Sequence, residues 1–346
     1  MFEKFIGNNL IKENLKRLIE HKRVPHSLLF AGAEGIGKKQ FAMEIAKAFV
    51  CQNPKMSEVC DICSACRRAD KFVFPKSEDK DGFKRVIFSE HSDVGLVIPF
   101  NKNILVDAIR ELETEANFRP FEAEARFFLI DEADKMNESA SNALLKTLEE
   151  PASTTYLFLI TSRPDALLPT IRSRCQTVRF APIEAKQIES CLLSTKKFSP
   201  VDAELLSKLS KGSVGHALNT DLEKFRGQRE TMLRVLESLL IIKDRAALLR
   251  VAEEMNDPKI KDEYETRLEI LQTLIHDIWL LRLGGAKENL VNIDILQDLK
   301  KLSARAHHKI LPMWLTEIET LRERLNVNIN RKIAADALFM QMANVF

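Results

Sequence analysis

Short apolar runs alternate with amphipathic segments over the first half of the chain. The runs that have the length and composition of buried strands lie at residues 28–31, 85–89, 127–131, 156–161 and 177–180. The intervening segments show helical periodicity, for example at 104–116 and 139–149. Because strands buried on both faces read as nearly continuous apolar runs, this alternation predicts a parallel sheet covered by helices on both sides.

The pattern changes after Pro182, where helical segments take over. Two short amphipathic segments, 185–195 and 200–209, precede the turn Gly212-Ser213-Val214-Gly215, and long Leu- and Ile-rich helical patterns run from about residue 225 to the end. Nine of the twelve prolines lie at or before Pro182. We therefore expect an α/β domain over residues 1–181, a small helical lid domain over 182–224 and an all-α domain over 225–346. The polar stretch 70–91 is expected to be a solvated insertion.

Composition and charge narrow the class of protein. The chain has 346 residues, 45% of them hydrophobic, and a formal charge of +2 at pH 7. That balance gives no global attraction to nucleic acid, so a DNA contact would need a local patch or a partner protein. No apolar run reaches membrane-spanning length, and Met1 to Phe5 lack the pattern of a signal peptide. We expect a cytoplasmic protein with no membrane contact.

A glycine-rich octamer, Gly32-Ala33-Glu34-Gly35-Ile36-Gly37-Lys38-Lys39, lies between the first apolar run and a helical segment at 40–50. Strand, glycine turn and helix is the order of a phosphate-binding loop, in which backbone N–H groups face a polyphosphate. The pattern requires Ser or Thr after the lysine, because that hydroxyl holds magnesium, and Lys39 stands there instead. Its ammonium could pair with phosphate or point to solvent. Binding of ATP or ADP is therefore a question separate from the fold, since a tight turn without ligand would use the same residues.

Acidic residues follow a later apolar run, which ends in Asp131-Glu132. In ATPases with a phosphate loop, the first acid supports magnesium and the second polarises the attacking water. Asp131 and Glu132 hold those two positions. The plain alternative is a strand end with exposed acids.

Four cysteines, Cys51, Cys60, Cys63 and Cys66, are separated by eight, two and two residues. Four thiolates suit a closed tetrahedral zinc site, and the Cys-x-x-Cys-x-x-Cys run places three sulfurs on one turn while Cys51 reaches back from a helix end. Disulfides are the main rival, but they are rare in cytosolic proteins. We predict structural zinc without a catalytic role. The remaining cysteines, Cys175 and Cys191, are expected to be ordinary buried residues.

An arginine at the edge of a nucleotide-binding domain can reach a neighbouring subunit's γ-phosphate, and Ser173-Arg174-Cys175 offers one. Alone, the tripeptide says little, because an exposed arginine is usually a solvated charge.

Together these features resemble the bacterial clamp-loader subunits of the AAA+ ATPase superfamily, motif by motif over about residues 1–220. The stretches that carry the resemblance are Phe5-Ile6-Gly7-Asn8, Pro25-His26-Ser27-Leu28-Leu29-Phe30, the module from Cys51 to Cys66, Asp131-Glu132-Ala133-Asp134, Asn142-Ala143-Leu144-Leu145-Lys146-Thr147-Leu148-Glu149-Glu150-Pro151 and Ser173-Arg174-Cys175. The resemblance implies a P-loop (AAA+) parallel-sheet domain, a helical lid and an all-α C-terminal collar domain. It also implies that Thr161 and Ser162 stand where active members orient water.

That family contains motor subunits, called gamma or tau, and a stator called delta prime. Motors have Thr or Ser after the loop lysine and a sensor arginine in a Gly-Ser-x-Arg segment. This chain has Lys39 in the first place and Gly215 in the second, so it resembles delta prime, and His216 is expected to be a surface or packing residue. The implied ATPase activity is absent or very weak, with no polymerase chemistry in the chain itself. Arg174 is then expected to act in trans on ATP in an adjacent motor.

The resemblance further implies partners in the DNA polymerase III holoenzyme. These are the gamma/tau and delta subunits, with the sliding clamp and primer-template DNA contacted through the assembled complex. Two alternatives stay open: a catalytically active gamma/tau-like ATPase, and a zinc-dependent interaction module with no role at an ATP site.

Overall fold

The computed structural model describes residues 2–54, 58–256, 263–325 and 330–344. The chain divides into two compact units. One comprises Met1–Thr195 with Ser210–Leu218, and the other comprises Lys196–Leu209 with Asn219–Phe346. The expected boundaries at residues 181 and 224 stay predictions.

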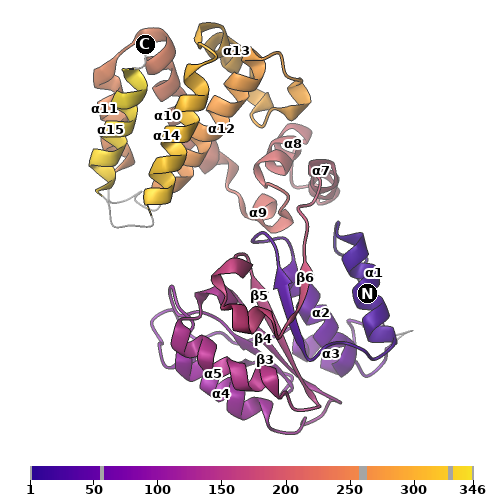
Figure 1. The fold of residues 1–346 in the computed structure, drawn as a ribbon. Coiled ribbons are helices and arrows are strands. Elements are labelled where there is room, and N and C mark those ends of the chain that lie inside the picture. Colours follow the sequence, from indigo (N-terminus) through magenta and orange to yellow (C-terminus); the bar gives the residue numbers. More distant parts are fainter. Residues whose placement is uncertain (1, 55–57, 257–262, 326–329, 345–346) are drawn as a thin grey trace. The chain divides into compact units, whose positions relative to one another are not determined.

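The first unit is built on a six-stranded sheet with the strand order β2-β3-β4-β5-β1-β6 (Figure 1). The strands are β1 (Ser27–Ala31), β2 (Ile87–Phe88), β3 (Val94–Val97), β4 (Arg126–Ile130), β5 (Thr155–Thr161) and β6 (Gln176–Arg179). Neighbouring strands are parallel, except that β2 pairs with β3 in the antiparallel sense. β5 lies between β1 and β4, so the carboxyl ends of these three strands meet at one edge. Ligands of open α/β sheets bind at such an edge.

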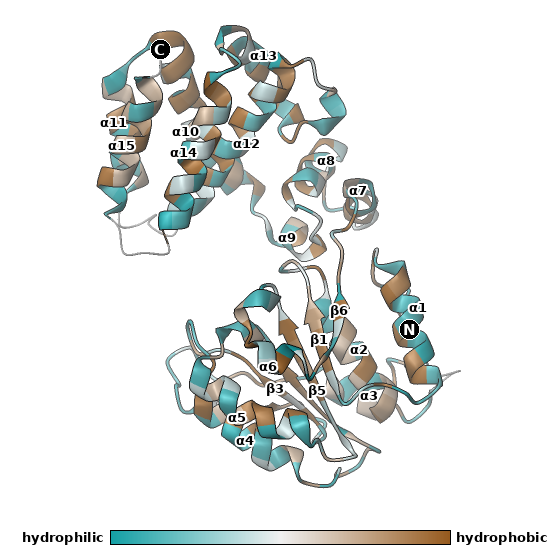
Figure 2. Cartoon of the chain, viewed as in Figure 1, coloured by the Kyte–Doolittle hydropathy of each residue, from teal (hydrophilic) through white to brown (hydrophobic). Residues whose placement is uncertain are grey.

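Helices cover both faces of this sheet, as the alternation of apolar runs predicted. Side chains of one face, such as Leu29 and Phe128, pack with α4 (Val106–Ala116) and α5 (Glu138–Glu149). On the other face Phe49 of α2 (Lys38–Val50) packs against Phe127. Figure 2 shows the apolar strands between helices whose polar residues face away from the sheet. The predicted α/β class is confirmed.

Local signals begin and end the helices. Asn137 precedes α5, and its side chain accepts a hydrogen bond from the backbone N–H of Ala140 at 2.9 Å, which satisfies a donor that the helix leaves free. The other helical elements of this unit are α1 (Asn9–Glu20), α3 (Ser64–Ala69), α6 (Pro169–Arg172), α7 (Ala185–Ser194), α9 (Val214–Asn219) and the short turns η1 (Gly82–Lys84), η2 (Ala133–Lys135) and η3 (Pro164–Ala166).

The second unit is helical throughout its described part. It contains α8 (Pro200–Leu209), α10 (Leu222–Glu237), η4 (Ser238–Ile242), α11 (Arg245–Met255), α12 (Tyr264–Arg282), η6 (Lys287–Asn289), η7 (Ile293–Ile295), α13 (Leu296–Arg305), α14 (Ile310–Arg324) and α15 (Arg331–Ala343). Trp314 is fully buried in its core and donates its indole N–H to the carbonyl of Met342, while Trp279 packs against the same core. In the described ranges, no helix combines the length and apolarity that crossing a bilayer needs.

The region before residue 100 contains one strand that was not predicted and one stretch that is less exposed than expected. β3 was missed because it is only four residues long and contains Gly95, which lowers strand propensity. Glycine is needed there, since a Cβ would lie 2.6 Å from Cγ1 of Val86. The stretch 70–91 is a solvated insertion only in part: residues 76–81 are exposed, but Val86 and His91 are buried beside the sheet.

Candidate functional site

The predicted phosphate loop connects β1 to α2 in the expected order of strand, turn and helix. Gly35 and Gly37 have φ values of +70° and +106°. Residues with a Cβ rarely adopt this left-handed conformation, so the tight turn depends on glycine at both positions. α2 begins at Lys38, directly after the turn.

Lys38 turns back onto its own loop. Its ammonium donates hydrogen bonds to the carbonyls of Gly32 and Ala33, both at 2.7 Å, and the residue is buried. Burial lowers the pKa of Lys38, because removal from water disfavours the charged form. The lysine that would contact phosphate therefore links the start of α2 to the first two residues of the loop.

Lys39 pairs with the acid expected to support magnesium. Its Nζ lies 3.1 Å from Oδ2 of Asp131, which follows β4, and both side chains are about one-third exposed or less. The pair forms because β4 and β1 flank β5 and end at the same edge of the sheet. Neither of the two positions considered from sequence, on phosphate or in solvent, matches this contact. A fixed ammonium stands against the carboxylate that would face a metal.

The neighbouring acids are also committed to partners within the chain. Glu132 forms an ion pair with Lys135. Asp134 accepts a hydrogen bond from the Thr161 hydroxyl at 2.7 Å and is bonded to the Arg163 guanidinium at 2.9 Å. Burial raises the pKa of Asp134, but these hydrogen bonds outweigh it and the net shift is downward. Thr161 is buried at the end of β5, whereas Ser162 is exposed.

Gly215 packs backbone to backbone on the loop. Its N–H donates to the carbonyl of Gly35 at 2.9 Å, at the start of α9. A Cβ at position 215 would lie 2.7 Å from that carbonyl oxygen, a distance that real Cβ atoms do not tolerate. His216 donates its backbone N–H to the Ser213 hydroxyl and is exposed, as expected of a surface residue. An arginine at position 215 has no room in this arrangement.

Arg174 lies in the turn between α6 and β6 and is exposed. Its guanidinium donates to Oε1 of Glu149, at the end of α5, at 2.5 Å and to the carbonyl of Thr170 at 3.0 Å. The side chain is therefore held near the surface in one orientation by a carboxylate of its own chain.

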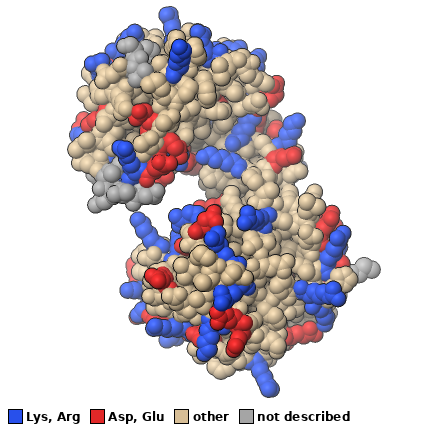
Figure 3. All heavy atoms as spheres, in the orientation of Figure 1, with Lys and Arg blue, Asp and Glu red and all other residues tan. Residues whose placement is uncertain are grey.

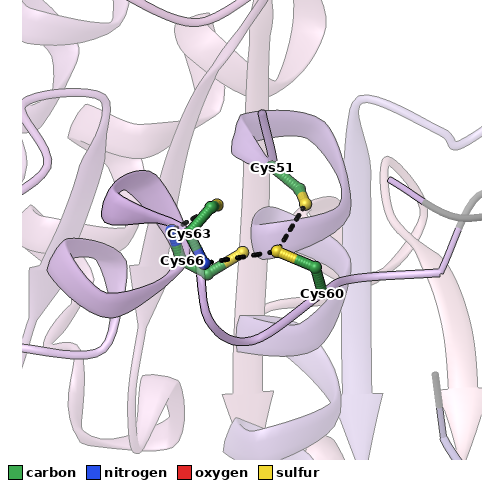
Figure 4. Close-up of side chains that lie close together, drawn as sticks. All are labelled: Cys51, Cys60, Cys63 and Cys66. Carbon is green, nitrogen blue, oxygen red and sulfur yellow. Dashed lines mark hydrogen bonds between the residues drawn. The ribbon is translucent and has the colours of Figure 1, made fainter. Parts of the chain in front are cut away.

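The four cysteines of the predicted metal site come together in space. Their sulfurs all lie within 4.8 Å of one another, and none of the four is in a disulfide (Figure 4). Cys51 follows the last residue of α2, and Cys63 caps α3, with the backbone N–H of Cys66 on its sulfur at 3.4 Å. Tetrahedral zinc with bonds of about 2.3 Å needs sulfurs about 3.8 Å apart, so this donor set fits such a metal.

The thiol of Cys63 has a lowered pKa. Burial raises the pKa of Cys63, but backbone hydrogen bonds at Cys66 and Gln52 and the neighbouring thiols outweigh it and bring the pKa to about 6. A thiolate is the form that binds metal. Cys175 is buried far from the cluster along the chain, where burial raises its pKa to about 12, and Cys191 is half-buried.

Comparison with known proteins identifies the family. The sequence model described as DNA polymerase III, delta subunit, matches residues 7–184, and a second model for the C-terminal part of the same subunit matches residues 224–343. DNA polymerase III subunit delta' of Pseudomonas aeruginosa is 30% identical over 92% of this chain and 92% of that protein. The chain belongs to the DNA polymerase III delta-prime family. The delta' subunit of Bacillus subtilis is similar too, at 29% identity over 90% of this chain and 89% of its own length.

The chain is also similar to proteins named as tau subunits. DNA polymerase III subunit tau of Bacillus subtilis is 30% identical over 78% of this chain, which spans 46% of the tau protein. The names of these relatives indicate that this chain is a subunit of a clamp loader. Similarity at this level does not assign roles to individual residues, which are argued below from the contacts that they make.

Two contacts in the site escaped prediction from sequence. The Lys39–Asp131 pair had a signal, since a surplus lysine in the loop and an acid at a nearby strand end are opposite charges at one sheet edge. The contact between Gly35 and Gly215 had none, because residues 180 apart in sequence give no hint that their backbones touch.

Proposed function

We propose that this chain is the delta prime, or stator, subunit of a DNA polymerase III clamp loader, and that its own phosphate loop does not hydrolyse ATP. In this proposal it assembles with gamma/tau and delta subunits, and the complex helps to place the sliding clamp on primer-template DNA. Figure 3 shows Lys and Arg interleaved with Asp and Glu on the visible face of each unit, so that face presents charges of both signs and not a purely basic surface for DNA.

The observation that carries the silent site is the Lys39–Asp131 ion pair. Magnesium needs oxygen ligands in octahedral geometry, which an ammonium cannot supply, and a second cation beside Asp131 would meet like-charge repulsion from Lys39. Position 215 also lacks an arginine to contact the γ-phosphate. By analogy with arginine fingers, that absence should lower the rate of hydrolysis by about 10³-fold.

Arg174 is the residue that we propose acts on a neighbour. It is exposed, and its only charged partner in the described ranges is Glu149, which itself is half exposed. An incoming phosphate can replace that carboxylate, because Arg binds both groups with the same planar fork of donors. The chain would then complete an active site that it does not contain.

We also propose that Cys51, Cys60, Cys63 and Cys66 hold zinc in a structural role. Four thiolates leave no open position for a substrate, so the metal would supply only cross-linking of α2 to α3. Metal analysis of protein purified without chelator tests this assignment, and a zinc content near zero would contradict it.

ATP turnover by the isolated chain separates the stator from the main alternative, a gamma/tau-like ATPase favoured by the similarity to tau. We expect no turnover above background for the natural chain and none for Lys39→Thr, because that variant restores the hydroxyl but still lacks the arginine at position 215. Motor-like turnover by the natural chain would overturn the stator proposal.

The reconstituted loader tests the arginine. With Arg174→Ala, DNA-stimulated ATPase is expected to fall, because the site that Arg174 faces should lose about 10³-fold in rate. Arg172→Ala is the matched control, since Arg172 lies two residues away and is paired with Asp165. Undiminished ATPase with Arg174→Ala, at normal assembly, would favour an interaction module with no role at an ATP site.

A further inference from the structure

A cluster of five charged residues joins α2 to the cysteine module. Lys47 and Glu44, both on α2, have side chains only 5% and 3% exposed. Lys47 lies 2.8 Å from Asp70 and also pairs with Asp61. Lys4, from the N-terminal segment, contacts Asp61 and Glu44 at 2.8 Å each. A buried lysine thus meets carboxylates from three places in the chain.

These carboxylates stand beside the metal-binding cysteines. Asp61 lies between Cys60 and Cys63, in a left-handed turn with φ of +56°. Asp70 directly follows α3, the helix that contains Cys66. On the α2 side, the backbone N–H of Cys51 donates to the carbonyl of Lys47 at 2.9 Å. Lys47 therefore contacts the segments on both sides of the cluster, the helix end that bears Cys51 and the turn and helix that bear the other three.

The buried ammonium of Lys47 requires compensation by nearby carboxylates. A lysine ammonium removed from water is costly unless carboxylates compensate it with good geometry. Asp61 and Asp70 can reach Lys47 only when the turn after Cys60 and the end of α3 lie against α2. The same placement brings the four sulfurs within reach of one metal ion.

We propose that Lys47 is a positioning residue for the four-cysteine site, which it pre-assembles by holding Asp61 and Asp70 against α2. The proposal rests on the metal assignment made above. It reduces the ordering that metal binding must otherwise impose on the turn after Cys60 and on α3, and a site that is already ordered binds its ligand more tightly. Side chains that orient metal ligands without touching the metal usually change affinity by about 10- to 100-fold when removed.

Cobalt affinity of the reduced full-length chain tests the proposal. Co²⁺, titrated in competition with a chelator, reports both affinity and tetrahedral thiolate coordination through its visible absorption. We expect Lys47→Met to weaken Co²⁺ binding by about 10- to 100-fold and Lys47→Arg to recover part of the loss, because Arg keeps the charge. Lys71→Met is the matched control: the Lys71 side chain is exposed and its ammonium pairs with Glu90, not with Asp61 or Asp70, so the affinity should stay unchanged.

Asp61→Asn gives a second, milder test in case Lys47→Met does not fold. Asn tolerates the left-handed turn but removes the charge that pairs with Lys47, so cobalt binding should weaken here as well. Unchanged affinity in folded Lys47→Met or Asp61→Asn protein, even with lowered stability of the metal-free form, would show that the cluster only stabilises the fold and would overturn the proposal. Failure of the natural chain to bind cobalt or zinc would instead remove the metal assignment itself.

Discussion

Replacing Gly215 by alanine should destabilise the contact between α9 and the phosphate loop, although glycine-to-alanine changes in helices usually stabilise. The usual gain is about 0.5–1 kcal/mol, because alanine loses less conformational entropy on folding. Here the new Cβ would lie 2.7 Å from the carbonyl oxygen of Gly35 and 3.0 Å from its Cα. Both are backbone atoms, so neither can move aside as the end of a flexible side chain could.

The magnitude follows from the two losses. Overpacking against a fixed neighbour costs about 1–3 kcal/mol, and separating the backbones removes the 2.9 Å hydrogen bond from Gly215 to Gly35, worth about 1 kcal/mol. After the gain in helix propensity is subtracted, the contact should weaken by about 1–3 kcal/mol. Because each 1.4 kcal/mol is tenfold, local opening should become about 5- to 150-fold more frequent.

Native-state hydrogen exchange measures this opening at the amides of residues 32–38 and 210–218. Gly227→Ala is the matched control: Gly227 lies within α10, and nothing lies within 4 Å of a Cβ built there. That variant should gain about 0.5–1 kcal/mol and leave exchange in the loop unchanged. If the amides of the Gly215→Ala variant instead exchange as slowly as those of the natural chain, the backbones of Gly35 and Gly215 are not in contact.

Three further outcomes are expected. Asn137→Ala should cost about 1 kcal/mol of unfolding free energy in urea, because α5 loses its cap, whereas Ser139→Ala on the same turn should cost little. The pKa of Asp134 is lowered in the folded state, so its contribution to stability is complete above the ordinary value of 3.8 and is lost as the pH falls toward the folded value; the unfolding midpoint of Asp134→Asn should therefore depend less on pH below about 4 than that of the natural chain. Removing metal with a chelator under reducing conditions should lower the thermal midpoint, and added zinc should restore it, if the four cysteines hold zinc.

The sequence predicted best what depends on local pattern. The strands β1, β4 and β5 are buried on both faces and read as apolar runs, and the close spacing of Cys60, Cys63 and Cys66 nearly fixes their distances. β3 could not be recognised, because four residues that include Gly95 carry too little signal. Its place between β2 and β4 follows only from the assembled sheet.

The contacts that define the phosphate loop lay beyond the reach of sequence for a different reason. Lys39 could have met phosphate, solvent or any nearby acid, and only the strand order, which places β4 and β1 on either side of β5, selects Asp131. Likewise, Glu149 is one of several acids that could have met Arg174, and the ends of α5 and α6 had to be placed in space first. Pairings between distant charges are decided by topology, which a linear pattern does not contain.

The ion pair between Lys39 and Asp131 balances the charge of Asp131 from within the chain. With a hydroxyl at position 39, the carboxylate of Asp131 would have no counter-charge from that position until a cation bound from solution. Here the counter-charge is part of the chain, so its effective concentration is set by covalent connection and not by the supply of magnesium or nucleotide. Changes in the ratio of ATP to ADP should therefore leave the conformation of this loop unchanged.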